Sequence, residues 1–170
     1  MAITLYKLGI SAYSLLIQIA SLFNQKAKLL VEGRKQTWAK LENFSQQNHK
    51  SVYWFHAASL GEFEQGRPII ERLKKINPNS TILLSFFSPS GFEVRKNYEG
   101  AELVVYLPSD NAQNARRFLD LTRPKAALFI KYEFWYHYLR ECSNQKILTL
   151  SVSSIFRSEQ PFFKFYGGLH

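Results

Sequence analysis

Between residues 51 and 152, five short apolar runs alternate with segments of helical periodicity, which restricts the chain to few folds. The runs are rich in β-branched and aromatic residues and are continuously apolar. Such strands are buried on both faces, as in parallel sheets covered by their crossover helices. We therefore expect an α/β fold, a parallel sheet with helices on both faces. The expected strands are Val52–Ala57, Thr81–Phe87, Glu102–Pro108, Lys125–Ile130 and Lys146–Val152.

Helices are expected in the segments between these strands. The segments with helical character are Glu64–Lys75, Ser88–Tyr98, Asn111–Leu121 and Glu133–Cys142. Pro68 is expected in the first turn of its helix, where a missing backbone N–H is tolerated. Asp110 precedes the third of these helices, and we expect its side chain to cap it.

The residues that follow the strands are the candidates for a functional site. In open parallel sheets, ligands bind beyond the carboxyl ends of the strands. These positions are residues 56–62, 88–91, 108–111, 131–135 and 153–157. They contain most of the polar side chains singled out below.

Glu62 is the clearest candidate, in the segment HAASLGEFEQGRP after the first strand. Gly61 permits close approach of the backbone, and a helix is expected to begin near Glu62. The positive end of a helix stabilises a carboxylate, so on that ground Glu62 should be ionised at neutral pH. An ionised carboxylate at the mouth of a pocket can act as a general base. The alternative is that Glu62 only complements the helix dipole.

A second group of candidates lies after the other strands. Glu133 and Trp135 follow the fourth strand, and two acids at neighbouring strand ends could share one pocket. Ser88 and Ser90 flank a proline in a turn that could hold a phosphate or a sugar hydroxyl. Arg157 could bind an anion. The alternatives are a first-turn acid, a helix cap and a surface arginine.

The amino-terminal segment Ile3–Phe23 is mostly apolar, and its polar residues are spaced to form one stripe on a helix. The stripe consists of Lys7, Ser11, Ser14, Gln18 and Ser21. Residues 1–50 carry seven basic against two acidic side chains, so they hold +5 of the net charge of +9. We predict membrane association, with a spanning helix and an interfacial helix both open, and residues 26 onward in the cytoplasm. A helix packed on its own protein is the alternative.

Several classes of site are disfavoured. The chain has one cysteine, Cys142, so no internal disulfide is possible. Its four histidines show no ligand spacing, and no metal site is expected. Neither a dinucleotide-binding nor a P-loop motif is present, and no cofactor is expected. The globular part is only mildly basic, which disfavours a nucleic-acid partner.

Several of these segments together resemble the 3-deoxy-D-manno-octulosonic acid (Kdo) transferase family of Gram-negative bacteria. The similar segments, in order after the apolar amino-terminal helix, are GRK (Gly33–Lys35), HAASLGEFEQGRPIIERLK (His56–Lys74), SPSG (Ser88–Gly91), YLPSDN (Tyr106–Asn111), RPKAALFIKYEFWY (Arg123–Tyr136) and SSIFRS (Ser153–Ser158). The chain departs from the family's pattern at Lys131, Tyr132 and Tyr136, which leaves both acids in place.

The resemblance implies the amino-terminal, acceptor-side half of a two-domain (GT-B type) glycosyltransferase with Rossmann-like halves. That enzyme would transfer Kdo from CMP-Kdo to the lipid A precursor with inversion, in lipopolysaccharide core biosynthesis. It would act at the cytoplasmic face of the inner membrane. The resemblance makes Glu62 the catalytic base and Glu133 a transition-state stabiliser. The candidates for acceptor binding are Ser59, Gly61, Ser88, Ser90 and Arg157.

The expected organisation has four parts. Residues 1–40 form the membrane-associated helix and basic segment, residues 41–50 a linker, residues 51–160 the Rossmann-like domain, and residues 161–170 the start of a hinge to a donor-binding domain. Without that second domain, the chain is expected to be inactive. The alternative functions are a related glycosyltransferase that uses another sugar nucleotide, and a non-catalytic membrane-binding module.

Overall fold

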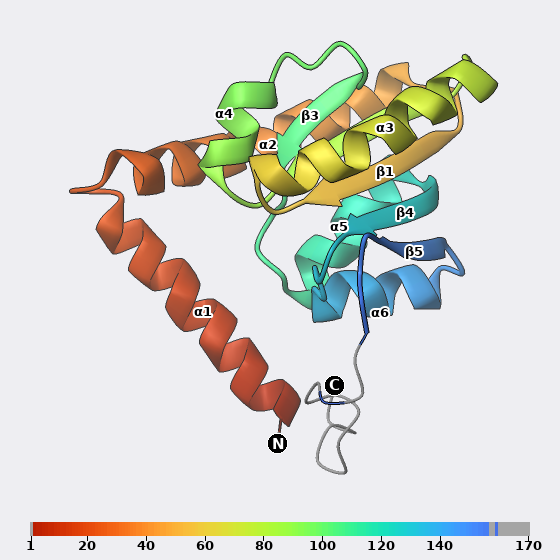
Figure 1. Cartoon of the computed structure of the whole chain (residues 1–170). Coiled ribbons are helices and arrows are strands. Elements are labelled where there is room, and N and C mark those ends of the chain that lie inside the picture. Colours follow the sequence, from red (N-terminus) through yellow and green to blue (C-terminus); the bar gives the residue numbers. More distant parts are fainter. Residues whose placement is uncertain (1, 157–158, 160–170) are drawn as a thin grey trace.

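The structure is a computed structural model that describes residues 2–156 and residue 159. Its elements, in chain order, are α1 (Ala2–Ala20), α2 (Gln25–Gln47), β1 (Val52–Ala57), α3 (Leu60–Ile76), β2 (Thr81–Phe86), α4 (Pro89–Arg95), β3 (Leu103–Tyr106), α5 (Ala112–Thr122), β4 (Pro124–Ile130), α6 (Tyr136–Asn144) and β5 (Leu148–Val152). Helices lie on both sides of the sheet, and α1 extends from the start of α2 toward α6 (Figure 1). The expected α/β fold with an apolar amino-terminal helix is confirmed.

All five strands belong to one parallel sheet in the order β3-β2-β1-β4-β5. The chain builds outward from β1 to β3 and then returns to the other side of β1 to add β4 and β5. The order of strands therefore reverses between β1 and β4. Sheets of this kind bind ligands at that point, in the crevice beyond the carboxyl ends of the strands. The segments after Ala57 and Ile130 leave the sheet next to each other at this crevice.

Each face of the sheet has its own apolar core. On one face, Phe55 packs against side chains such as Phe63 from α3, and α4 completes the layer. On the other face, α2, α5 and α6 pack around Trp54, whose ring lies 4.8 Å from that of Phe118 and 5.6 Å from that of Tyr138. The central strands are thus buried on both sides, as their continuous apolar sequences indicate.

Helix α3 begins earlier than the sequence suggests. The sequence predicts a start near Glu62, with clear helical spacing from Glu64, but the helix begins at Leu60. The Glu62 side chain accepts hydrogen bonds from the backbone N–H groups of Ala58 and Ser59, ahead of the first turn. That cap satisfies N–H groups that would otherwise lack partners, and the helix extends up to it. Pro68 consequently lies in the helix interior, and the expectation of a first-turn proline is wrong.

Asp110 does not cap the helix that follows it. Asn111 caps α5 by accepting a hydrogen bond from the Asn114 N–H at 2.8 Å. The buried Asp110 carboxylate instead accepts from the N–H groups of His137 and Tyr138, at 3.1 and 3.2 Å, at the start of α6. The cap prediction is wrong because the N–H donors were expected from the helix that follows Asp110, whereas they come from His137 and Tyr138, 27 and 28 residues away.

The predicted linker at residues 41–50 is largely helical. Residues 41–47 form the last turns of α2, which ends at the C-cap Asn48. Leu41 is fully buried in the core that α2 shares with α5 and α6. This helix is therefore a packed layer of the domain, in addition to being its connection to α1.

Helix α1 contacts the domain with one side only. Tyr13 stacks on Phe87, with ring centroids 5.9 Å apart, and the Tyr6 hydroxyl donates to the Asp110 carboxylate. Its other side is apolar and at least half exposed, at Leu5, Leu8, Leu15, Leu16 and Ile19. Within the described residues, α1 is long and apolar enough to cross a membrane, judged by length and composition.

Candidate functional site

Glu62 lies at the carboxyl end of β1, on the first turn of α3. Its Oε2 accepts hydrogen bonds from the N–H groups of Ala58 at 2.5 Å and Ser59 at 3.2 Å. Its Oε1 has no hydrogen-bond partner within the part of the chain that the structure describes. One oxygen therefore fixes the carboxylate, and the other is left to accept a proton. Gly61 is exposed, and a Cβ built there would meet no atom within 4 Å.

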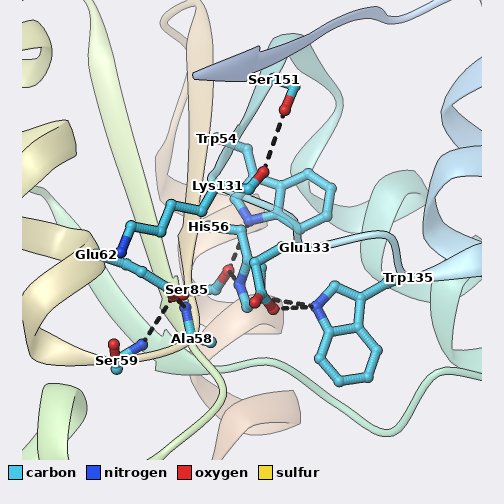
Figure 2. Close-up of polar contacts among 10 residues, drawn as sticks. All are labelled: Trp54, His56, Ala58, Ser59, Glu62, Ser85, Lys131, Glu133, Trp135 and Ser151. Carbon is cyan, nitrogen blue, oxygen red and sulfur yellow. Dashed lines mark hydrogen bonds and ion pairs between the residues drawn. The ribbon is translucent and has the colours of Figure 1, made fainter. Parts of the chain in front are cut away.

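Glu133 follows β4, the neighbour of β1, at the same edge of the sheet as Glu62. It lies before α6, which begins at Tyr136, and not in its first turn as expected. Its half-buried side chain, 15% exposed, receives a hydrogen bond on Oε2 from Trp135 Nε1 at 2.8 Å. His56 Nε2 lies 3.4 Å from the same oxygen (Figure 2). Structure thus brings the two predicted acids to one site.

His56 is a buried polar residue that links Glu133 to the sheet. Its Nδ1 lies 2.8 Å from Ser85 Oγ, which also accepts a hydrogen bond from Trp54 Nε1 at 2.8 Å. With the Ser85 hydroxyl donating to Nδ1, a ring proton of His56 lies on Nε2, toward Glu133. Trp135 Nε1 lies 3.0 Å from the same His56 nitrogen. Because that nitrogen carries a proton in this tautomer, the Trp135 N–H donates to Glu133 Oε2.

Neither His56 nor Ser85 was predicted as a site residue. The signal was present, since each is a polar side chain in an otherwise apolar strand. Buried polar groups in such strands need partners. The two residues pair in the parallel register of β1 and β2, a register that becomes known only from the structure.

The pKa of Glu62 is raised above its ordinary value. Burial is the largest cause, and the negative charge of Glu133 is the second. The N–H groups of Ala58 and Ser59 and the nearby His56 act in the opposite direction. The helix terminus thus does favour the ionised form, as expected, but the surroundings outweigh it. A carboxyl group with a raised pKa is a stronger base once it has lost its proton.

The loop that carries Glu133 is held in place by the end of β5. Lys131 adopts the left-handed region, with φ of 64°, which turns the chain sharply after β4. Its carbonyl oxygen accepts from Ser151 Oγ at 3.1 Å and from Ser154 Oγ at 2.7 Å. The Tyr132 hydroxyl donates to the carbonyl of Ile155 at 2.7 Å. The residues after β5 therefore position this acid.

The serine turn lies beside the Glu62 turn. The Ser88 N–H donates to the Ala58 carbonyl at 2.9 Å, and the Ser88 and Ser90 hydroxyls are 2.6 Å apart. Ser59 is half-buried at the N-cap of α3. These three serines line neighbouring turns, whereas Arg157 lies outside the described residues.

An aromatic stack connects this site to α1. The Phe87 ring stacks on that of Trp135, with centroids 4.8 Å apart, and on its other neighbour Tyr13 of α1. Trp135 in turn donates to Glu133. In the described residues, no group of three or more His, Cys, Asp or Glu side chains could hold a metal ion.

The sequence pattern of one protein family, described as 3-deoxy-D-manno-octulosonic-acid transferase (kdotransferase), matches residues 34–164. This chain belongs to that family. The match covers the sheet, both acids and their supporting residues. The resemblance noted from the sequence segments is thus confirmed.

Individual Kdo transferases are similar to parts of this chain. The 3-deoxy-D-manno-octulosonic acid transferase of Aquifex aeolicus is 38% identical over 92 residues, which cover 54% of this chain and 25% of the relative. A probable mitochondrial 3-deoxy-D-manno-octulosonic acid transferase of Arabidopsis thaliana is 34% identical over 86 residues, which cover 50% of this chain and 19% of the relative. The 3-deoxy-D-manno-octulosonic acid transferase of Haemophilus influenzae is 30% identical over 83 residues, which cover 48% of this chain and 19% of the relative. The matched part therefore spans a quarter or less of the length of these Kdo transferases.

Proposed function

We propose that this chain is the acceptor-side part of a glycosyltransferase that moves Kdo from CMP-Kdo to the lipid A precursor with inversion, in lipopolysaccharide core biosynthesis. One observation carries the proposal: two carboxylates, Glu62 and Glu133, follow the carboxyl ends of the neighbouring strands β1 and β4, where the strand order reverses. The family to which the chain belongs supports the choice of sugar. In this proposal, the part described here binds the acceptor, and a further part of the complete protein binds most of CMP-Kdo.

In the proposed reaction, Glu62 acts as the general base. Its unpaired Oε1 takes the proton from an acceptor hydroxyl, while Oε2 stays bound to backbone N–H groups. The acceptor oxygen then bonds to the anomeric carbon of Kdo, and the bond from that carbon to the phosphate of CMP breaks. A single displacement of this kind inverts the configuration of the sugar.

Glu133 stabilises the transition state in this proposal. Positive charge develops on the sugar ring as the bond to CMP breaks, and a fixed carboxylate nearby lowers its energy. The hydrogen bond from Trp135 and the contact with His56 Nε2, 3.4 Å from Oε2, hold the carboxylate in one orientation. The serines Ser59, Ser88 and Ser90, with Gly61, remain the proposed contacts for acceptor hydroxyls, and Arg157 remains a predicted contact.

The test compares two glutamates on the same helix in the complete protein. We expect Glu62→Gln to reduce the rate of Kdo transfer by about 100-fold or more, the scale of losing a general base. Glu71→Gln is the matched control, because Glu71 is half exposed on α3 and forms an ion pair with Arg67. Near-normal transfer by Glu62→Gln would refute the catalytic assignment. Preference for a different sugar nucleotide over CMP-Kdo would favour the alternative glycosyltransferase.

We also propose that α1 places the protein at the cytoplasmic face of the inner membrane. The exposed apolar side of α1 supports this location. The predicted boundary at residue 40 is then drawn too late, because α2 packs on the domain from Ala27 onward. The double substitution Leu8→Glu with Leu16→Glu should release the complete protein from membranes into the soluble fraction. Lys125→Glu, at an exposed position on β4, should leave it bound. Equal membrane retention of both would contradict the location.

A further inference from the structure

Helix α2 approaches the end of β3 unusually closely. A Cβ added at Gly33 would lie 2.2 Å from the Tyr106 ring, so only glycine fits there. The buried Thr37, one turn later, donates from its hydroxyl to the Tyr106 carbonyl at 3.1 Å. This close packing carries the next residue, Arg34, to the edge of the sheet where the strands end. The family-like GRK segment thus has a geometric reason.

The Arg34 side chain is held rigidly but is not neutralised. Its Nε donates to the Leu107 carbonyl at 3.1 Å, and its guanidinium carbon lies 5.1 Å from the centre of the Phe87 ring. Among the residues that the structure describes, Leu107 is its only hydrogen-bond partner, and no carboxylate pairs with it. The four N–H bonds on its two terminal nitrogens therefore remain for another acceptor. A half-buried guanidinium with this fork matches an anion with two oxygens.

Arg34 lines a cavity between α1 and the domain. The cavity has a volume of about 250 Å³, and its polar lining consists of Ser14, Gln18, Arg34, Lys35, Ser109 and Asn114. This volume is below the usual ~300–1,000 Å³ of ligand pockets, so it suits one substituent of a ligand. Arg34 and Lys35 both contribute positive charge, and hydroxyl and amide groups supply further donors.

A second cavity of about 690 Å³ shares four of these residues and continues along the polar stripe of α1. Lys7 and Ser11 line it, so the stripe predicted from the sequence faces the domain. Its one acid, Asp110, is already bound by Tyr6 and by the N–H groups that start α6. The opposite side of α1 is apolar and exposed. The cavities therefore lie between α1, whose outer side is apolar, and the domain.

We propose that Arg34 and Lys35 bind the phosphate group of a lipid headgroup in this cavity. A phosphate monoester carries up to two negative charges, which the two neighbouring cations can neutralise, whereas a carboxylate carries one. The inference rests on the proposed membrane location of α1 and not on the catalytic role of Glu62. Binding can therefore be measured without any transfer reaction, so the two proposals can fail separately.

The test measures binding of the complete protein to phosphatidylcholine vesicles with and without phosphatidic acid. Arg34→Met removes the charge but keeps an apolar stem against Phe87, and we expect it to reduce the preference for phosphatidic acid about 20-fold or more. The matched control is Lys28→Met, which removes the same charge from an exposed position of α2. A basic side chain near an anionic surface contributes at most about five-fold in general. Equal losses in the two variants would overturn the proposal.

Two further arms complete the design. Ser109→Asp places a carboxylate in the cavity lining without changing Arg34, and it should also reduce the preference for phosphatidic acid. If Arg34→Met does not fold, this variant decides, and an unchanged preference overturns the proposal. Inorganic phosphate at millimolar concentration distinguishes the sources. Competition by it assigns the site to phosphate as such, and binding that resists it assigns the site to the lipid-linked form.

Discussion

Replacing Gly61 by alanine separates the needs of the fold from those of the ligand. A Cβ at this position meets no protein atom within 4 Å, and the residue lies in the first turn of α3. Alanine in place of glycine in a helix gains up to about 1 kcal/mol. We therefore expect Gly61→Ala to raise the free energy of unfolding slightly, or at least not to lower it.

The same methyl group would stand beside Glu62 on the open side of the site. If an acceptor approaches the backbone here, the added group costs about 1–3 kcal/mol in the complex, as in other overpacked contacts. The KM for the acceptor should then rise roughly ten-fold, since ~1.4 kcal/mol corresponds to a factor of ten. Steady-state transfer by the complete protein, with varied acceptor concentration, measures this change.

Gly91→Ala is the structural counterpart. A Cβ at Gly91 would lie 2.4 Å from the Phe86 ring and 3.1 Å from the Leu60 nitrogen, so it should lower the free energy of unfolding by about 1–3 kcal/mol. Denaturant unfolding of both variants under identical conditions checks the difference in sign. An unchanged KM for Gly61→Ala would refute close approach of the acceptor, and destabilisation by it would refute the packing described for this turn.

Three further outcomes follow from the site. If Glu62 is the general base, it acts only when deprotonated, so the rate should fall as pH drops through its pKa. Because the charge of Glu133 raises that pKa, Glu133→Gln should move the acidic limb of the kcat/KM profile to lower pH. His56→Ala should lower kcat about ten-fold or more with little change in KM, since a loosened Glu133 loses transition-state stabilisation; an unchanged kcat would exclude a positioning role. Ser154→Ala should remove one hydrogen bond to the Lys131 carbonyl and lower the free energy of unfolding by ~1 kcal/mol. Denaturant unfolding measures the change, and Ser143→Ala, at an exposed position of α6, is the neutral reference.

The sheet was predictable because each strand can be recognised from its own short stretch of sequence. Continuous apolar runs of the right length, such as Val52–Ala57, have few other uses in a chain of this size. The position of Glu62 followed from the same reasoning, since strand ends form the binding edge of a parallel sheet. The order of the strands was not expressed in any one segment. That order is what brings Glu133 next to Glu62.

The remaining features depend on contacts between distant segments. Asp110 binds the start of α6, and its local sequence resembles an ordinary helix cap. Pro68 lies inside α3 because the cap at Glu62 extends the helix toward the amino terminus. His56 and Ser85 become partners only through the register of two strands. A local sequence pattern does not reveal these pairs, because each segment would form the same helix or strand without its partner.

The stack from Tyr13 through Phe87 to Trp135 has a practical consequence for preparing this protein. Shortening the chain to remove α1 would take away its exposed apolar side, and the buried residues of both cores lie outside α1. The shortened protein would nevertheless leave one face of the Phe87 ring bare, and that ring stacks directly on Trp135, the residue that donates a hydrogen bond to Glu133. Rate constants from such a truncated enzyme would then describe a site with altered support. The indole fluorescence of Trp135 offers a direct reading of whether the helix is seated.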